Sequence, residues 1–213
     1  MAIMLYSATM SLDGYIAGPG GDMSWLTPHI APNPLVDDLI PRIGAIIVGN
    51  RTFGGDDPHR GTDGAGKPFG GGWDGPQFVV THHPRPHGDG ITFVADVETA
   101  IREAKAAAGD RYVNIIGADI ARQCLALGEL DEILAITAPV LLGGGTRLLA
   151  FTQSDDDPRD ESRDESREEY REESERGAGH GGRRARSAGP VRLEQLHVSH
   201  TAQAINTWMR IIK

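Results

Sequence analysis

The clearest unit in the sequence runs from Asp96 to Val140 and alternates helix and strand signals. Asp96 is placed to cap a helix, "VETAIREAKAAAG", and the apolar run Val113–Gly117, "VNIIG", follows it. A second helix, "ADIARQCLALG", then leads into another apolar run at Ile133–Val140. Strands joined by crossover helices pair in parallel, because a parallel pair needs a long connection. This unit therefore predicts an α/β fold built on a mostly parallel central sheet.

Further strand signals lie on both sides of this unit. Leu35–Ile43 is a short amphipathic helix that Pro41 weakens, and the apolar "AIIVG" suits a strand buried on both faces. After residue 190, "VRLEQLHVSH" and "AINTWMRIIK" alternate like two antiparallel strands. We therefore expect a mostly parallel central sheet with flanking helices, closed by an antiparallel C-terminal hairpin. The other expected strands are Ile3–Thr9, Ala45–Gly49, Gln77–Thr81 and Ile91–Val94.

One segment differs from the rest in composition. Ser154–Pro190 carries 12 acidic and 8 basic residues and almost no aliphatic side chain, and a four-residue repeat begins at Arg159. Such a segment cannot bury enough apolar surface to offset its ordering entropy. We predict a single domain over residues 1–213, interrupted at about 153–190 by a disordered or transiently helical insertion. Docking of an unknown partner by this insertion is the alternative interpretation.

The overall composition excludes several classes of function. The net charge of −9 argues against nucleic acid as a partner, since phosphate backbones attract clustered Lys and Arg. No apolar run reaches the roughly 18 residues that cross a bilayer, and the N-terminus lacks a basic leader. We expect a cytoplasmic protein whose partner is a small molecule.

Three predicted strands end in residues suited to a nucleotide. Carboxyl ends of parallel strands meet at one edge of a sheet, where ligands bind, and helix N-termini favour phosphates. A cation and several hydroxyl or imidazole donors would complete such a site. These residues are Gly49, Arg51 and Thr52 in "VGNRTF", Thr81 and His82 in "VVTHHP", and Gly117, Ala118, Asp119, Ile120 and Ala121 in "IIGADIA".

Two other patterns are weaker candidates. The glycine triplet in "VLLGGGTRLL" lacks the lysine and the spacing of a P-loop, which predicts a turn beside the cleft. The histidines of "HHPRPHG" lack a completing cysteine or acid pair, so we expect no metal site.

Among the carboxylates, Asp13, Asp37 and Asp38 are the acid–base candidates, although solvated or turn-forming roles compete for each.

The chain resembles the dihydrofolate reductase-like superfamily, in the branch that contains the reductase domain of the riboflavin-biosynthesis deaminase/reductase. The resemblance covers residues 1–152 and 190–213. It rests on four stretches taken in order: "SATMSLDGYIAGPGGDMSWL", "GNRTF", "IIGADIA" and "ELDEILAITAPVLLGGGTRLL".

The resemblance implies an NADPH-dependent reductase that delivers hydride to a pterin-, pyrimidine- or imine-like heterocycle. It implies that Asp38 or Asp13 acts as the acid and that Trp25 and Asp37 contact the substrate. Members of the branch are often dimers, which the apolar C-terminal strands would permit. The cofactor contacts that it implies are Gly117 to Ala121 for the pyrophosphate, Gly49, Arg51 and Thr52 for the phosphates, Thr81 and His82 for the adenosine, and Ile16 and Gly18 for the nicotinamide ribose.

Two departures from the family pattern keep alternatives open. The chain has Gly117-Ala118 where Gly-Gly is common, and Asn50 where the first arginine of Gly-Arg-x-Thr is common. These changes leave the choice between NADPH and NADH open, and also a non-catalytic scaffold on the same fold. A third alternative, the pyrimidine reductase step of riboflavin synthesis, would need a second basic cluster, for which the candidates are Arg42, Arg60 and Lys67.

Overall fold

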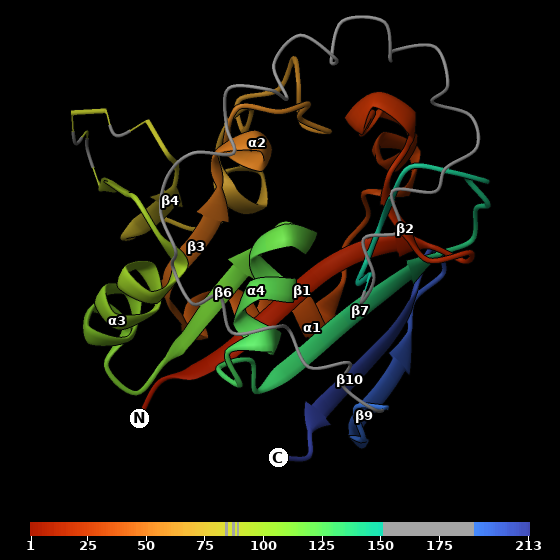
Figure 1. Ribbon diagram of the computed structural model, residues 1–213. Coiled ribbons are helices and arrows are strands. Elements are labelled where there is room, and N and C mark those ends of the chain that lie inside the picture. The colour runs from red at the N-terminus through yellow and green to blue at the C-terminus, as the bar shows by residue number, and fades with distance from the viewer. Residues whose placement is uncertain (84, 87, 89, 151–189) are drawn as a thin grey trace, which may run out of the picture. The chain divides into compact units, whose positions relative to one another are not determined.

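A sheet of eight strands organises the protein in the order β5-β4-β3-β6-β1-β7-β10-β9 (Figure 1). The first six strands of this order are parallel, and β10 and β9 continue the sheet as an antiparallel pair. The predicted fold class is therefore confirmed. The strands are β1 (Ile3–Ser11), β3 (Ile43–Gly49), β4 (Gln77–Val80), β5 (Ile91–Val94), β6 (Tyr112–Ile116), β7 (Glu132–Ala138), β9 (Leu193–His200) and β10 (Ile205–Ile211).

The computed structural model describes residues 1–83, 85–86, 88, 90–150 and 190–213. Within these ranges, Met1–Ala150 and Val191–Lys213 form one compact unit. The predicted insertion at about 153–190 lies outside the described residues except for its last residue, so its character stays a prediction. None of the helices in the described ranges combines the length and hydropathy that crossing a bilayer requires.

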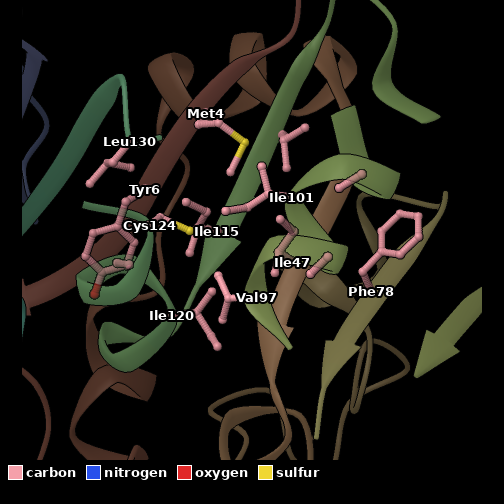
Figure 2. Packing of buried hydrophobic residues seen from close by; sticks show 14 of the residues in the cluster. Met4, Tyr6, Ile47, Phe78, Val97, Ile101, Ile115, Ile120, Cys124 and Leu130 are labelled. Carbon is pink, nitrogen blue, oxygen red and sulfur yellow. The ribbon is translucent and has the colours of Figure 1, made fainter. Parts of the chain in front are cut away.

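One face of the sheet packs against α3 (Val97–Ala108) and α4 (Ala118–Ala126). Asp96 caps α3 as predicted, because its Oδ1 accepts a hydrogen bond from the Thr99 amide at 2.7 Å. Figure 2 shows the aliphatic packing of this face, where Cys124 of α4 is fully buried. Burial disfavours the thiolate and raises the pKa of Cys124 to about 12, so this thiol serves as a packing group.

The opposite face of the sheet is covered by shorter elements. Helix α1 (Pro34–Leu39) has six residues and continues into the 3₁₀ turn η3 (Ile40–Arg42), because Pro41 cannot extend the α-helix. Leu39 is buried against the sheet, and the indole of Trp73 donates to the carbonyl of Ile43 at 3.1 Å. This face therefore has a core of its own, covered by elements shorter than α3 and α4.

The remaining elements lie in the connections. Figure 1 shows α2 beyond the carboxyl end of β3. A second, small sheet pairs two segments that are more than a hundred residues apart in sequence, Tyr15–Ala17 and Thr146–Arg147. These elements are β2 (Tyr15–Ala17), η1 (Pro19–Gly21), η2 (Ser24–His29), α2 (Asn50–Phe53), η4 (Pro68–Gly71) and β8 (Thr146–Arg147).

Candidate functional site

The carboxyl edge of the parallel strands brings together most of the residues predicted to bind the cofactor. Gly49 is the last residue of β3, Thr81 follows β4, and Gly117 follows β6. β3 lies between the other two strands, with Gly49 paired to Val80 and Val48 paired to Ile116. The three strand ends are therefore neighbours, as expected for a ligand site at this edge.

Gly117 forms a cradle with the hydroxyl of Thr52. Its φ of +104° belongs to a region that side chains other than glycine rarely adopt. A Cβ added to Gly117 would lie 2.6 Å from Oγ1 of Thr52, so the hydroxyl directly adjoins the glycine backbone. Gly49 is similarly close to α4, because its Cβ would lie 3.3 Å from Cγ1 of Ile120. The missing side chains at these two positions therefore let Thr52 and Ile120 pack directly against the strand ends.

The N-terminus of α4 has no capping side chain among the described residues. Because the first amides of a helix have no carbonyl partner within it, those of Ala118, Asp119 and Ile120 are free to bind an anion. The amide of Ala121 is already used, since it donates to the carbonyl of Gly117 at 3.2 Å. Three of the four predicted amides thus have no hydrogen-bond partner among the described residues.

The side chains around this helix end are mostly polar and exposed. Asp119 accepts hydrogen bonds from Arg122 at 2.7 Å and from Gln123 at 2.8 Å, which pairs its charge within α4. Arg51 is exposed on α2, beside Thr52, with no hydrogen bond or ion pair to any residue that the structure describes. Its guanidinium is therefore available to a bound phosphate.

The strand end after β4 offers less to a ligand. Thr81 is buried, and its Oγ1 accepts a hydrogen bond from the amide of His83 at 3.2 Å. His82 is exposed next to it. Thr81 therefore shapes the turn and has little surface for a ligand, whereas the imidazole of His82 is accessible.

Asp13 holds the first loop against the glycine triplet. Its carboxylate accepts hydrogen bonds from the Ser11 hydroxyl at 2.5 Å and from the amides of Leu142 at 3.1 Å and Gly143 at 2.7 Å. These bonds, chiefly the one from Ser11, lower the pKa of Asp13 to about 2. A carboxyl group that stays ionised at neutral pH is a poor proton donor, so the geometry favours a structural role for Asp13.

The glycine triplet is a turn that packs on the first loop. Gly143 and Gly145 both have positive φ, and a Cβ on Gly145 would clash with the backbone of Ala17 and Gly18. Ile16 is half-buried in β2, next to this contact. The triplet thus braces the loop that carries Ile16 and Gly18, which explains its glycines without a phosphate.

The structure places Asp37 and Asp38 away from this edge. Asp37 lines a surface cavity of about 500 Å³ with Trp73 and Arg111, and Arg111 directly precedes β6. Both carboxylates are exposed. Because α1 precedes β3, its last turn must lie where β3 begins, at the amino edge of the sheet. The sequence pattern predicted the helix, but it did not show at which edge of the sheet the acidic residues of that helix would lie.

Trp25 lies on a turn that packs beside the loop following α2. The amide of Met23 donates to Asp56 at 3.0 Å, and the hydroxyl of Thr27 donates to the carbonyl of Pro58 at 3.2 Å. The indole nitrogen of Trp25 is buried and has no hydrogen-bond partner among the described residues. Trp25 is therefore held near the segment that carries Thr52, and it keeps an unused donor.

Sequence reasoning missed a set of residues on the α1 side of the sheet. Ser7 and Thr9 of β1, Ile116 of β6 and Ile136 of β7 are half-exposed although their strands are central, and we call these four residues the floor. On the same face, two residues before Ile116 in β6, Asn114 is fully buried, and its Oδ1 accepts a hydrogen bond from Ser7 at 2.7 Å. The only signal in the sequence was a lone asparagine inside the apolar run "VNIIG".

Solved structures share this fold at low sequence identity. A protein assigned to riboflavin biosynthesis from Shewanella sp. PV-4 aligns over all of both chains, with 19% identity and a TM-score of 0.63. Dihydrofolate reductase from Enterococcus faecalis, complexed with NADP(H) and RAB-propyl, aligns over 98% of this chain and 95% of that one, with 13% identity and a TM-score of 0.55.

A longer protein from Thermotoga maritima shows the same likeness. It is a diaminohydroxyphosphoribosylaminopyrimidine deaminase/5-amino-6-(5-phosphoribosylamino)uracil reductase, with 16% identity and a TM-score of 0.60. The alignment covers 99% of this chain but only 57% of that protein. No curated protein sequence matches the chain. Residues 2–159 match the family described as the RibD C-terminal domain, and the chain therefore belongs to that family.

Proposed function

We propose that this protein is an NADPH-dependent reductase that transfers hydride to a small, pyrimidine-, pterin- or imine-like heterocycle. The cradle of Gly117 and Thr52 at the uncapped N-terminus of α4 carries this proposal. It lies at the carboxyl edge of a parallel sheet, where folds of this class bind ligands. Membership of the RibD C-terminal domain family supports the same activity.

The residues at this edge fit a dinucleotide phosphate. Free amides of Ala118, Asp119 and Ile120 offer donors to a pyrophosphate, and the Thr52 hydroxyl, which lies against the backbone of Gly117, offers a further one. Arg51 supplies an unpaired cation on the neighbouring α2, within the part of the chain that the structure describes. When bound, the nicotinamide would supply the hydride, because the chain has no such group of its own.

The chain itself would position the two reactants and shield them from water. The floor lies on β1 and its two neighbours, next to the strand end that carries Gly117, so a ring on it would be close to a cofactor held by α4. The turn carrying Trp25 packs beside the loop that follows α2 and would cover the outer side. Holding reactants in a fixed orientation is a large part of enzymatic rate enhancement.

The geometry does not favour a phosphate-bearing pyrimidine as the substrate. Arg42 lies at the amino edge, 4.9 Å above the ring of Tyr112, and donates to its hydroxyl at 3.1 Å. Arg60 pairs with Asp56 at 2.7 Å. Of the three basic residues that could hold a second phosphate, only Lys67 has no such bond in the described ranges, so they form no cluster.

We also propose that the protein forms a homodimer, and one surface feature supports this. The edge strand β9 and its partner β10 expose four apolar side chains, which water solvates poorly. Light scattering across a dilution series would measure the mass in solution, and a monomer at all concentrations would contradict the proposal. These side chains are Leu193, Leu196, Val198 and Ile205.

Nucleotide titration tests the proposed activity. We expect NADPH to quench tryptophan fluorescence in the wild type, and Arg51→Ala to raise its Kd about tenfold by removing a charge-assisted contact. Arg102→Ala, an exposed position on α3, is the matched control and should leave the Kd unchanged. Absence of binding by both NADPH and NADH at millimolar concentration would overturn the proposal. Turnover is then followed by the loss of NADPH absorbance with a panel of pterins and pyrimidines.

A further inference from the structure

The N-terminus of α4 carries a carboxylate of its own. Asp119 is the second residue of this nine-residue helix and the acidic residue of its first turn. The positive end of a helix attracts a carboxylate for the same reason that it attracts a phosphate, and aspartate side chains readily bond nearby backbone amides. The carboxylate of Asp119 and a phosphate would therefore compete for the free amides of Ala118, Asp119 and Ile120.

The carboxylate of Asp119 does not bond these amides. Its Oδ1 accepts a hydrogen bond from Nη2 of Arg122 at 2.7 Å, and its Oδ2 accepts one from Nε2 of Gln123 at 2.8 Å. Both donors lie one turn further along α4, so the carboxylate is held along the side of the helix. Each carboxylate oxygen thus has a donor, whereas the first amides of α4 have no side-chain partner among the described residues.

Helix α3 shows the opposite arrangement. Asp96 precedes that helix, and its Oδ1 accepts a hydrogen bond from the amide of Thr99 at 2.7 Å. An anion that approached this end of α3 would have to displace the carboxylate. The two helices both have an aspartate near the N-terminus, but only in α4 is that aspartate bonded by other side chains of its own helix.

Release of the Asp119 carboxylate would close the end of α4 in two ways. The free carboxylate could bond the first amides itself. It would also leave a negative charge without a partner beside the place that a phosphate takes. The side chains of Arg122 and Asp119 are 39% and 65% exposed, so water and salt screen the charge. Occupation of the amides is therefore the larger of the two effects.

We propose that Arg122 and Gln123 are positioning residues: they hold the carboxylate of Asp119 off the N-terminus of α4 and keep its first amides open to a cofactor phosphate. Neither side chain needs to touch the phosphate for this. The inference rests on the proposed function, because it concerns access to that same nucleotide site. It adds that a residue of the chain competes with the cofactor, and that two neighbours suppress this competition.

Nucleotide titration of a variant that frees the carboxylate tests the inference. Arg122→Ala/Gln123→Ala removes both donors and should raise the Kd for NADPH about tenfold at low ionic strength, because Asp119 then bonds the amides. The Tm of this variant should equal or exceed that of the wild type, since the released carboxylate stabilises the helix end. An unchanged Kd would overturn the inference.

A third substitution separates competition from direct contact. Asp119→Ala in the same background removes the competitor and should return the Kd to within about twofold of the wild type. Failure of this rescue overturns the inference, because it would mean that the two donors bind the phosphate themselves or only stabilise α4. Lys105→Ala is the matched control: it breaks the ion pair with Glu129, which follows the other end of α4, and the Kd should be unchanged.

Amide signals in NMR spectra locate the carboxylate without any nucleotide. In Arg122→Ala/Gln123→Ala, the amide protons of Asp119 and Ile120 should shift downfield and exchange more slowly with water than in the wild type. Asp119→Ala in the same background should reverse both changes at Ile120. Amide signals of the double variant that match those of the wild type would show that the carboxylate does not move, against the inference.

The outcomes keep the inference apart from the proposed function. If the wild type binds neither NADPH nor NADH, the proposed function fails, and inorganic pyrophosphate followed by the same amide signals then measures access to the helix end. Weaker binding of pyrophosphate by Arg122→Ala/Gln123→Ala, restored by Asp119→Ala, supports the inference. Equal binding of pyrophosphate by the wild type and this double variant overturns it.

Discussion

Both edges of the central sheet carry polar groups, but the groups differ in whether they have hydrogen-bond partners within the fold. At the amino edge the carboxylate of Glu132 is buried and accepts hydrogen bonds from the indole of Trp208 at 2.9 Å, from Arg210 at 3.3 Å and from the hydroxyl of Tyr112 at 3.5 Å. At the carboxyl edge, the first amides of α4 have no capping side chain among the described residues. In the middle of β6, Nδ2 of Asn114 has no partner among them either.

The difference separates polar groups that have partners within the fold from groups that have none among the described residues. A buried charge with several partners holds elements together, and it has no capacity left for a further contact. A free helix N-terminus and an unpaired amide lose stability in the unliganded protein and regain it when a ligand supplies the partner. We therefore expect substitutions at the amino edge to change stability, and substitutions at the carboxyl edge to change ligand binding.

The largest expected effect is at the amino edge. Glu132→Ala leaves the indole of Trp208 without its acceptor and should lower the free energy of unfolding by about 3 kcal/mol. Urea unfolding followed by tryptophan fluorescence measures this loss. Glu194→Ala is the matched control, because Glu194 meets the same Arg210 from an exposed position at 3.5 Å. A loss in Glu132→Ala no larger than in the control would remove the contrast between the edges.

Gly117→Ala should affect both stability and binding. The positive φ strains an alanine by about 1–2 kcal/mol, and the new methyl group meets Oγ1 of Thr52. We expect the Kd for NADPH to rise more than tenfold, because the methyl group displaces the Thr52 hydroxyl from its place beside the N-terminus of α4. Gly128→Ala is the matched control: it has φ of +73° and nothing within 4 Å of its Cβ position, so it should carry strain alone. Equal NADPH affinity in both variants would show that the cradle is not the nucleotide site.

A comparison of the two helix N-termini gives a smaller effect. Asp96→Ala removes the cap of α3 and should cost about 1 kcal/mol of stability with no change in NADPH affinity. Thermal unfolding and the nucleotide titration measure the two quantities on the same sample. A change in the Kd for NADPH would contradict the assignment of the ligand to α4, because it would show that the N-terminus of α3 affects binding.

The smallest effect is expected from Asp13 and depends on pH. The pKa of Asp13 falls from its ordinary value of 3.8 to about 2 in the folded protein, so its hydrogen bonds stabilise the fold above pH 3.8. This stabilisation is lost as the pH falls toward 2. The difference in Tm between the wild type and Asp13→Asn should be constant near neutral pH and shrink between pH 4 and pH 2. A difference that does not change with pH would contradict an ionised, loop-holding carboxylate.

Much of the fold could be predicted because its signals are local. The cap at Asp96, the apolar run of β3 and the glycine at the start of α4 each follow from neighbouring residues. The strand ends that hold Gly49, Thr81 and Gly117 were found for the same reason. Strand order places them side by side once the sheet is parallel.

The acid candidates and the floor depend on distant partners, so local patterns could not settle them. Asp13 meets amides about 130 residues away along the chain, at Leu142 and Gly143. Asp37 lies at an edge that depends on how α1 is placed before β3. The hydroxyl of Ser7 donates to Asn114, which lies 107 residues later in the chain.

By itself the sequence determined the succession of strands and helices and the strand ends that form the carboxyl edge, because periodicity and capping act over a few residues. The tertiary structure alone decided which polar groups have partners. Hydrogen bonds between distant segments consume the carboxylate of Asp13 and leave Nδ2 of Asn114 unpaired. Whether a side chain supports the fold or can meet a ligand depends on that pairing, which no local pattern records.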